Sequence, residues 1–147
     1  MNISWYDLNE IDDCEIKFVV VIAKYRGELI LIRNKDRTVW ELPGGRREEG
    51  EAIIETAKRE LYEETGSIIF ELTPIGTYLF NESYGMIFCA DVEAMSELPA
   101  YEIAEIRFSK SLPEGLNYGD VYYKMYDKIT TKTINESINI KCDLRHE

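Results

Sequence analysis

Residues 43–66 constrain the fold more than any other part of the sequence, because a loop signal, a helical run and a helix stop follow one another there. Pro43-Gly44-Gly45 is a strong loop signal, since proline restricts the backbone and glycine permits tight turns. Residues 51–65 are rich in helix formers and contain neither proline nor glycine. Gly66 then supplies the residue that commonly ends a helix. The segment predicts a loop followed by a helix over residues 51–65.

Runs of β-forming residues lie on both sides of this segment. Residues 18–23 and 29–32 flank a turn at 25–28, which predicts a hairpin, and residues 40–42 predict a short strand that leads into the loop. Strands in hairpin and crossover settings, with few helices, predict an α/β (α+β) fold in which helices cover a mixed sheet. The other expected elements are strands at 68–71, 75–80, 86–92 and 105–108, a turn at 81–85 and a second helix at 119–129.

The end of the sequence leaves two readings open. Ile134 and Ile138 are four residues apart, as on one face of a helix, whereas Ile138 and Ile140 alternate, as in a strand. Residues 130–147 are therefore either a last strand or a docked tail. Because no repeat or linker-like stretch interrupts the sequence, we expect a single domain over residues 1–147, with its core at roughly residues 15–129.

Composition argues against several classes of protein. The sequence has 147 residues, of which 45% are hydrophobic and 31% charged, as in a globular domain. No stretch approaches the ~20 apolar residues of a membrane span, and the first ten residues do not resemble a signal peptide. Three cysteines without a Cys-x-x-Cys pair argue against a disulfide framework or a zinc site. We therefore expect a cytoplasmic protein without a membrane partner.

The net charge of −11 bears on the choice of ligand. An acidic surface repels the backbone of DNA or RNA, so we expect no nucleic-acid partner. A small anionic substrate remains compatible with this charge, because a bound divalent cation inverts the local field.

Three glutamates share one face of the predicted helix. Glu60, Glu63 and Glu64 are spaced i, i+3 and i+4, which makes them neighbours on the helix surface. Like charges at this spacing destabilise a helix, whereas clustered carboxylate oxygens are what a hard cation such as Mg²⁺ requires. Taken alone, the cluster is either a solvated acidic face or a cation site. The neighbouring sector of the helix, which we expect to face the sheet, carries Ile54, Ala57 and Leu61.

The spacing of the fixed residues decides between these readings. The order is Gly45, five residues, Glu51, seven residues, Arg59-Glu60-Leu61, one residue, Glu63-Glu64, one residue and Gly66. Chance would produce such a match on the order of once in 10⁸ placements. The segment resembles the Nudix box, G-x5-E-x7-R-E-U-x-E-E-x-G-U, where U is a bulky aliphatic residue. Ser67 departs from the last aliphatic position. With the lead-in at residues 40–44, the resemblance extends over roughly residues 15–110 and implies a Nudix-type α/β/α sandwich.

The resemblance also implies a metal site. In this family the box forms a loop-helix-loop that holds a divalent cation, so the expected cofactor is Mg²⁺ or Mn²⁺. Glu51 is implied to lie at the start of the helix beside the cation, and Arg59 to pair with a box carboxylate and orient it. The implied metal ligands are Glu60, Glu63 and Glu64, together with the backbone carbonyl of Gly44.

The implied chemistry is attack of water on phosphorus. The cation polarises the phosphate oxygens and a carboxylate accepts the proton. Glu60 is the first candidate for this base, and the resemblance gives Glu64 and Arg59 catalytic roles as well. Many family members carry a further glutamate in the region of residues 101–107, where Glu105 matches better than Glu102, although either is also readable as a surface carboxylate.

The substrate is predicted more coarsely than the reaction. The small size resembles the MutT-like enzymes that clear oxidised nucleotides, so we expect a small-molecule nucleotide, a nucleoside triphosphate, as substrate. Tyr84 lies where diadenosine polyphosphate hydrolases tend to carry a tyrosine, which leaves dinucleoside polyphosphates as the alternative. A non-catalytic nucleotide sensor is a further alternative, but such proteins usually lose box carboxylates. Trp40 and Tyr84 are the predicted substrate contacts, with Tyr78, Phe80 and Phe88 as other stacking candidates. We expect a monomer or homodimer.

Overall fold

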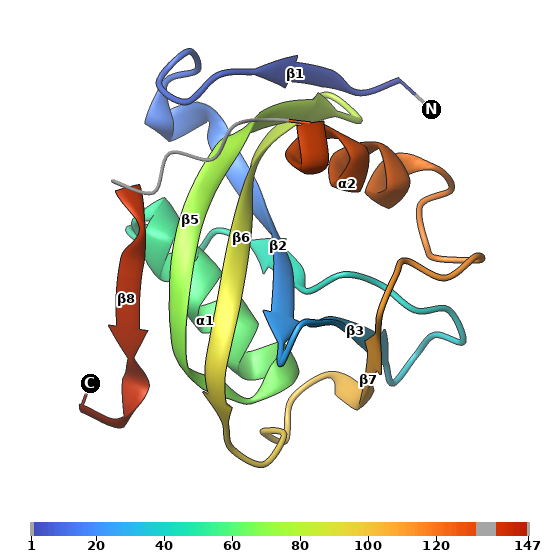
Figure 1. Cartoon of the computed structure of the whole chain (residues 1–147). Helices are drawn as coiled ribbons and strands as arrows, with labels where there is room; N and C mark the ends of the chain where they lie inside the picture. Colours follow the sequence, from blue (N-terminus) through green and yellow to red (C-terminus); the bar gives the residue numbers. More distant parts are fainter. Residues whose placement is uncertain (1, 132–137, 147) are drawn as a thin grey trace.

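A computed structural model describes residues 2–131 and 138–146 of the chain. In these residues, eight strands form one mixed sheet in the order β1-β5-β6-β2-β3-β7, with β4 paired to β2 and β8 paired to β5 (Figure 1). The pair β2–β6 is parallel and the other pairs are antiparallel, which confirms the predicted mixed sheet. The strands are β1 (Ser4–Tyr6), β2 (Ile16–Tyr25), β3 (Glu28–Asn34), β4 (Gly44–Arg46), β5 (Ser67–Phe80), β6 (Ser83–Met95), β7 (Ile103–Ser109) and β8 (Ile140–Asp143).

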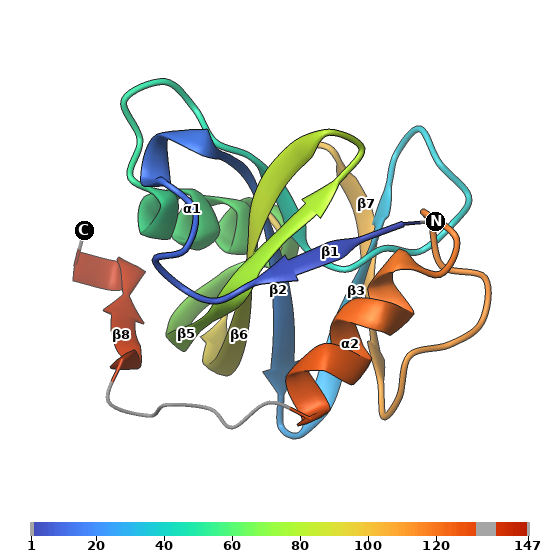
Figure 2. The same cartoon turned by 90° about the horizontal axis from the view of Figure 1, so that it is seen from above.

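The helices α1 (Ile53–Thr65) and α2 (Val121–Thr131) lie on opposite faces of this sheet (Figure 2). On the α1 face, Ala57 and Leu61 pack in a cluster that includes Phe88. On the α2 face, Met125 packs in a second cluster that includes Leu31. The predicted α/β/α sandwich is therefore confirmed. Neither helix, nor any other helix in the described residues, is long and apolar enough to cross a membrane.

Strand β2 has two different neighbours on one of its sides. Near its end it pairs with β3, at Lys24–Leu29 and Tyr25–Glu28, and near its start it pairs with β4. Between these pairings the chain crosses from β3 to β2, since Glu41 bridges to Ile32 and the Pro43 carbonyl accepts from the Val21 amide (2.8 Å). The sheet therefore divides at this point, and a cavity lies there.

The crossing corrects two predictions. Residues 43–45 were expected to form a loop, but Gly44–Arg46 is a short strand, and the predicted strand at 40–42 is a single bridge. The reason is the close approach of β4 to β2. A Cβ on Gly44 would lie 2.3 Å from the Val19 carbonyl oxygen, so glycine is required there for pairing and not for a turn.

Strand β5 is longer than predicted. The strands expected at 68–71 and 75–80 are one strand, because register shifts beside Ile69 and between Pro74 and Gly76 absorb a proline that cannot donate to the ladder. The turn to β6 is shorter than residues 81–85, since Asn81 and Glu82 alone connect the strands, both at positive φ.

The described part of the tail contains one strand, β8, between the end of α2 at Thr131 and a 3-10 helix at Leu144–His146. Strand β8 pairs with the first half of β5, with Cys142 opposite Phe70. The alternation that predicted a last strand is thus confirmed for Ile140–Asp143, whereas Ile134 lies outside the described residues.

The end of α1 is fixed in place by Gly66. Its φ is 79°, and its amide donates to the Tyr62 carbonyl (2.8 Å) while its carbonyl accepts from the Ser96 amide (2.7 Å). Ser67 is fully buried in place of the family's aliphatic residue, and its hydroxyl lies 2.6 Å from that of Thr65. The polar group that Ser67 brings into the core is therefore hydrogen-bonded, because its hydroxyl pairs with that of Thr65.

We predict that Gly66→Ala lowers the free energy of unfolding by about 2 kcal/mol or more, because the left-handed backbone and a Cβ 2.7 Å from the Ser96 carbonyl both oppose it. Gly50→Ala is the matched control, since Gly50 has the same φ of 79° with nothing within 4 Å, and it should cost about 1 kcal/mol. Urea denaturation measures both. Equal losses would contradict the contact with Ser96.

Candidate active site

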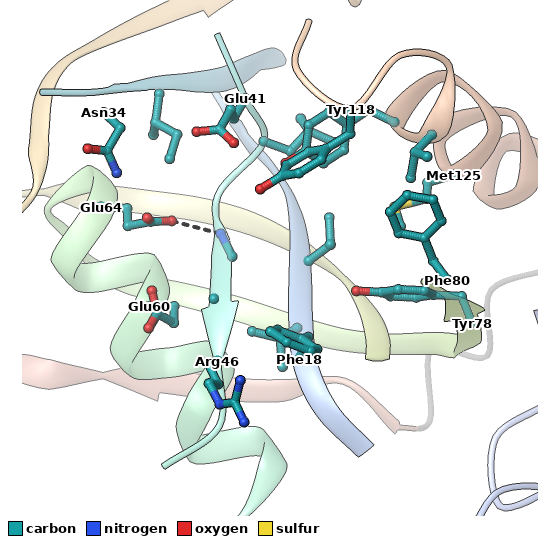
Figure 3. A pocket seen from close by; sticks show the side chains of 18 of the residues that line it. Phe18, Asn34, Glu41, Arg46, Glu60, Glu64, Tyr78, Phe80, Tyr118 and Met125 are labelled. Atoms are coloured by element: carbon teal, nitrogen blue, oxygen red, sulfur yellow. Dashed lines mark hydrogen bonds between the residues drawn. The ribbon is translucent and has the colours of Figure 1, made fainter. Parts of the chain in front are cut away.

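A cavity opens where the sheet divides beside β2. Its volume of about 590 Å³ is within the usual range for small-molecule sites. Figure 3 shows its two ends, with Glu60 and Glu64 on one side of β4 and Tyr78 and Phe80 on the other. The acidic end draws its side chains from α1 and from loops, and the aromatic end draws them from β2, β5, α2 and the segment before α2. The acidic residues that line the cavity are Glu41, Glu60, Glu64 and Glu102, and the aromatic ones are Phe18, Tyr78, Phe80, Tyr118 and Tyr122.

Glu60 and Glu64 lie one helical turn apart and both face the cavity (Figure 3). The Glu64 carboxylate accepts a hydrogen bond from the Gly44 amide (2.7 Å). Burial raises the pKa of Glu64 to about 9, although the Gly44 amide opposes this shift. Burial likewise raises the pKa of Glu60 to about 7, against the effect of Arg59. Neither the Glu60 nor the Glu64 carboxylate therefore has enough positive charge nearby to offset its burial.

The Arg59 guanidinium joins the loop before α1 to the helix itself. Its Nε donates to Glu51 (2.8 Å), its Nη1 to Glu60 (2.7 Å) and its Nη2 to the Arg46 carbonyl (2.9 Å). The predicted pairing of Arg59 with a box carboxylate is thus present. The Arg59 bond lowers the pKa of Glu51 to about 2, so Glu51 is ionised at neutral pH. Glu51 lies two residues before α1, because the helix begins at Ile53 and not at residue 51 as predicted.

Gly45 gives the Glu60 carboxylate its space. A Cβ at Gly45 would lie 2.3 Å from the Glu60 Cδ, so any side chain there would displace the carboxylate. Gly44 and Gly45 of β4 are therefore both required by close contacts, one with the β2 backbone and one with a side chain of α1.

The donor types at the acidic end fit a hard divalent cation. Carboxylate oxygens are the preferred ligands of such ions, and a cation would offset the desolvation that raises the pKa values of Glu60 and Glu64. Glu63 does not line the cavity, because its carboxylate turns toward Arg59 Nη1 (3.4 Å). Across residues 2–131 and 138–146, no three acidic, histidine or cysteine groups are close enough to form a complete metal site.

Glu102 lines the cavity and Glu105 does not. Glu105 pairs with Arg33 (2.9 Å), and its side chain is 55% exposed. In the β3–β7 ladder Glu105 is paired with Arg33, which does not line the cavity, whereas the neighbouring Ile32 and Asn34 do. Because side chains alternate between the faces of a strand, Glu105 lies on the face turned away from the cavity. The structure therefore places Glu102 where the sequence analysis expected Glu105.

Comparison with known proteins identifies the family. The sequence model of the NUDIX domain matches residues 15–110, which include β2 to β7 and the cavity's acidic end. The chain belongs to the Nudix family. Among solved structures, this Nudix chain is similar to the Bacillus subtilis pyrophosphohydrolase BsRppH, with a TM-score of 0.73 and 28% identity over 87% of this chain and 89% of that one. A Nudix family member from Chromobacterium violaceum, at 19% identity and a TM-score of 0.64, shares the fold over 78% of each chain.

Curated relatives cover less of the chain. A Bacillus subtilis protein named "Putative 8-oxo-dGTP diphosphatase YtkD" is 35% identical over 106 residues, which are 69% of this chain and 66% of that protein. Another protein of the same organism, named "Putative 8-oxo-dGTP diphosphatase", is 41% identical over 61 residues, or 42% of this chain and 40% of its own length. This chain thus spans less than two thirds of both relatives.

The predicted substrate contacts lie away from the cavity of this Nudix chain. Trp40 packs against the α2-side core beneath the Arg107 guanidinium (5.7 Å), and Tyr84 lies against Tyr6 (5.8 Å between ring centroids). Of the other stacking candidates, Tyr78 and Phe80 line the cavity, whereas Phe88 is in the α1-side core. The positions of these aromatic residues in the predicted strands could not show which of them line the cavity, because the arrangement of the whole sheet decides which face carries the cavity.

A polar network on the cavity wall was not predicted from the sequence. Glu41 is buried, and its Oε2 accepts from Arg37 Nη1 (2.8 Å) and from Asn117 Nδ2 (2.8 Å). Arg37 also donates to the Tyr118 hydroxyl (3.4 Å). These bonds join the loop after β3 to the segment before α2. One sequence signal was available, since an acidic residue between two apolar ones, Trp40 and Leu42, is unusual in a strand that is otherwise buried.

We predict that Glu64→Gln stabilises the metal-free protein at pH 8. The folded-state pKa of about 9 exceeds the ordinary 4.5, so the folded protein binds this proton more tightly and loses stability as pH rises above 4.5. Glutamine removes the titration and keeps the acceptor for the Gly44 amide. Urea denaturation with a chelator should show equal stabilities of the two proteins at pH 4 and an advantage of at least about 1 kcal/mol for the variant at pH 8. Parallel pH profiles would contradict the burial of Glu64.

Proposed function

We propose that this Nudix protein hydrolyses a phosphoanhydride bond of a nucleoside triphosphate in the presence of Mg²⁺ or Mn²⁺. The supporting observation is that one cavity joins desolvated carboxyl groups, Glu60 and Glu64, to an end lined with aromatic side chains. Cation and polyphosphate suit the first end, and a nucleobase suits the second. The names of the similar Bacillus subtilis proteins, "Putative 8-oxo-dGTP diphosphatase YtkD" and pyrophosphohydrolase BsRppH, agree with this substrate class, oxidised nucleotides included.

In this proposal Glu60, Glu64 and the Gly44 carbonyl hold the cation, and Glu63 joins them when its carboxylate turns from Arg59 toward the cavity. Nudix hydrolases generally need divalent metal ions. A bound cation supplies Lewis-acid polarisation of the phosphate oxygens and lowers the pKa of bound water. Arg59 fixes the orientation of Glu60 through its 2.7 Å bond, and its other bonds keep the loop at Gly45 against the helix.

We assign the proton-accepting role to Glu102. Its side chain lines the cavity beside Glu60 and Glu64, and its charge contributes to their raised pKa values. Glu60 is held by Arg59, whereas Glu102 has no hydrogen bond to its carboxylate among the described residues. A carboxylate that faces the cavity and is not engaged elsewhere is suited to accept a proton from water.

The alternative substrate class, dinucleoside polyphosphates, was suggested by Tyr84 alone. Tyr84 packs against Tyr6 outside the cavity and therefore does not support it. A nucleoside triphosphate is therefore the substrate class that we retain.

A kinetic comparison tests the proposed function. Purified protein is assayed for pyrophosphate and phosphate release from nucleoside triphosphates, 8-oxo-dGTP and dinucleoside polyphosphates, with Mg²⁺ or with a chelator. We expect turnover of triphosphates that requires the cation, and we expect Glu64→Gln to lower kcat/KM by about 10² or more. No turnover of any triphosphate would overturn the proposal.

The base is tested by a matched pair of variants. Glu102→Gln should lower kcat by about 10²–10⁴, the usual contribution of a general base. Glu105→Gln removes a neighbouring carboxylate that pairs with Arg33 outside the cavity, so it should change kcat by about two-fold or less. The reverse pattern would return the role to Glu105.

A further inference from the structure

Two tyrosine hydroxyls at the aromatic end of the cavity are not engaged by the fold. Tyr78 and Tyr122 are each 6% exposed and line the cavity. Neither hydroxyl has a hydrogen-bond partner among residues 2–131 and 138–146. Every fully enclosed side-chain oxygen in these residues has a partner, so neither of the two hydroxyls is fully enclosed. The two hydroxyls therefore face the open space of the cavity, and Figure 3 shows that of Tyr78 pointing into it.

The fold makes specific room for the Tyr78 phenol. Tyr78 in β5 pairs with Gly85 in β6, and a Cβ on Gly85 would lie 2.3 Å from the Tyr78 hydroxyl oxygen. Phenylalanine would fill the same apolar space without a polar group, and burying a hydroxyl without a partner costs stability. Packing alone therefore does not account for the hydroxyl, whereas a ligand atom would complete its hydrogen bonding.

Both phenols are proton donors at neutral pH. Burial raises the pKa of Tyr78 and of Tyr122 above the ordinary value of 10, and the nearby Glu41 charge adds to the effect on Tyr122. Protonated phenols donate one hydrogen bond each, so the complementary ligand atom is an acceptor. The neighbouring Tyr118 ring, 42% exposed and 5.7 Å from that of Tyr122, offers a flat face to a planar group.

We propose that Tyr78 and Tyr122 are specificity-determining residues that donate hydrogen bonds to the carbonyl oxygens of a keto nucleobase. The inference rests on the proposed function, since it assigns the aromatic end to the base and the acidic end to the phosphates. Guanine, 8-oxoguanine and uracil present such oxygens, whereas adenine presents none. The site therefore favours keto-base nucleotides over adenine nucleotides.

The test uses Tyr78→Phe and Tyr122→Phe, which each remove a single oxygen. We expect each variant to raise KM for GTP and UTP about three- to ten-fold with kcat unchanged, because the lost bond acts on ground state and transition state alike. KM for ATP and for inorganic tripolyphosphate should stay within about two-fold, since neither offers a base carbonyl. Tyr101→Phe is the control, because Tyr101 is 53% exposed and does not line the cavity.

Stability and binding measurements separate this inference from the proposed function. A role in recognition predicts that the thermal midpoints of both variants equal or exceed that of the wild type, whereas a structural role predicts lower midpoints. If the wild type hydrolyses no nucleotide, the proposed function fails, and calorimetric titration with GTP and ATP in the presence of Ca²⁺ still tests the inference. A loss of GTP affinity confined to the two variants supports it. Equal losses for GTP, ATP and tripolyphosphate, or no loss for any, overturn it.

Discussion

The Arg59 guanidinium is the interaction on which the acidic end of the cavity depends. It binds Glu51, Glu60 and the Arg46 carbonyl, so one side chain fixes the loop before α1, the direction of a carboxylate and the end of β4. Its planar fork suits three acceptors in fixed directions, which a lysine could not satisfy together. The two carboxylates share the Arg59 guanidinium but differ in pKa. At Glu51 the bond to Arg59 is the largest effect and lowers the pKa, whereas at Glu60 burial is the largest effect and raises it. The charges of Arg59, Glu51 and Glu60 are thus arranged to hold the carboxylates in fixed positions and not to give the protein its greatest stability.

The division of β2 between β3 and β4 supplies the space that these residues face. If β2 and β3 paired along their whole length, the chain at Glu41–Gly44 could not cross between them and no cavity would form there. Gly44 and Gly45 permit the crossing, since a Cβ on either would meet the Val19 carbonyl or the Glu60 carboxyl. The cavity then joins an acidic end, built by α1 and loops, to an aromatic end built by β2, β5, α2 and the segment before α2. One elongated, charged and partly planar molecule can therefore contact both ends.

Local sequence predicted the acidic end well and the aromatic end poorly. The helix, its stop at Gly66 and the faces of Leu61 and Glu64 follow from a period of 3.6 residues, which needs no knowledge of the rest of the chain. Glu102 was ranked below Glu105 because Glu105 matched the family resemblance better. That Glu102 and not Glu105 lines the cavity depends on how β7 pairs with β3, which no local pattern signals. Tyr122 was missed because its place in the cavity depends on where α2 docks. Residues held by one element were predictable, and residues brought together by several elements were not.

The central claim, that Glu60 and Glu64 hold a divalent cation inside this cavity, is tested most directly by anomalous X-ray diffraction from crystals soaked with Mn²⁺ and a non-hydrolysable nucleoside triphosphate. Mn²⁺ takes the same oxygen ligands as Mg²⁺ and scatters anomalously. We expect an anomalous peak at coordination distance from both carboxylates, with the triphosphate beside it and the base among the aromatic side chains. A peak confined to the outer surface, or no peak in crystals that contain bound nucleotide, would contradict it.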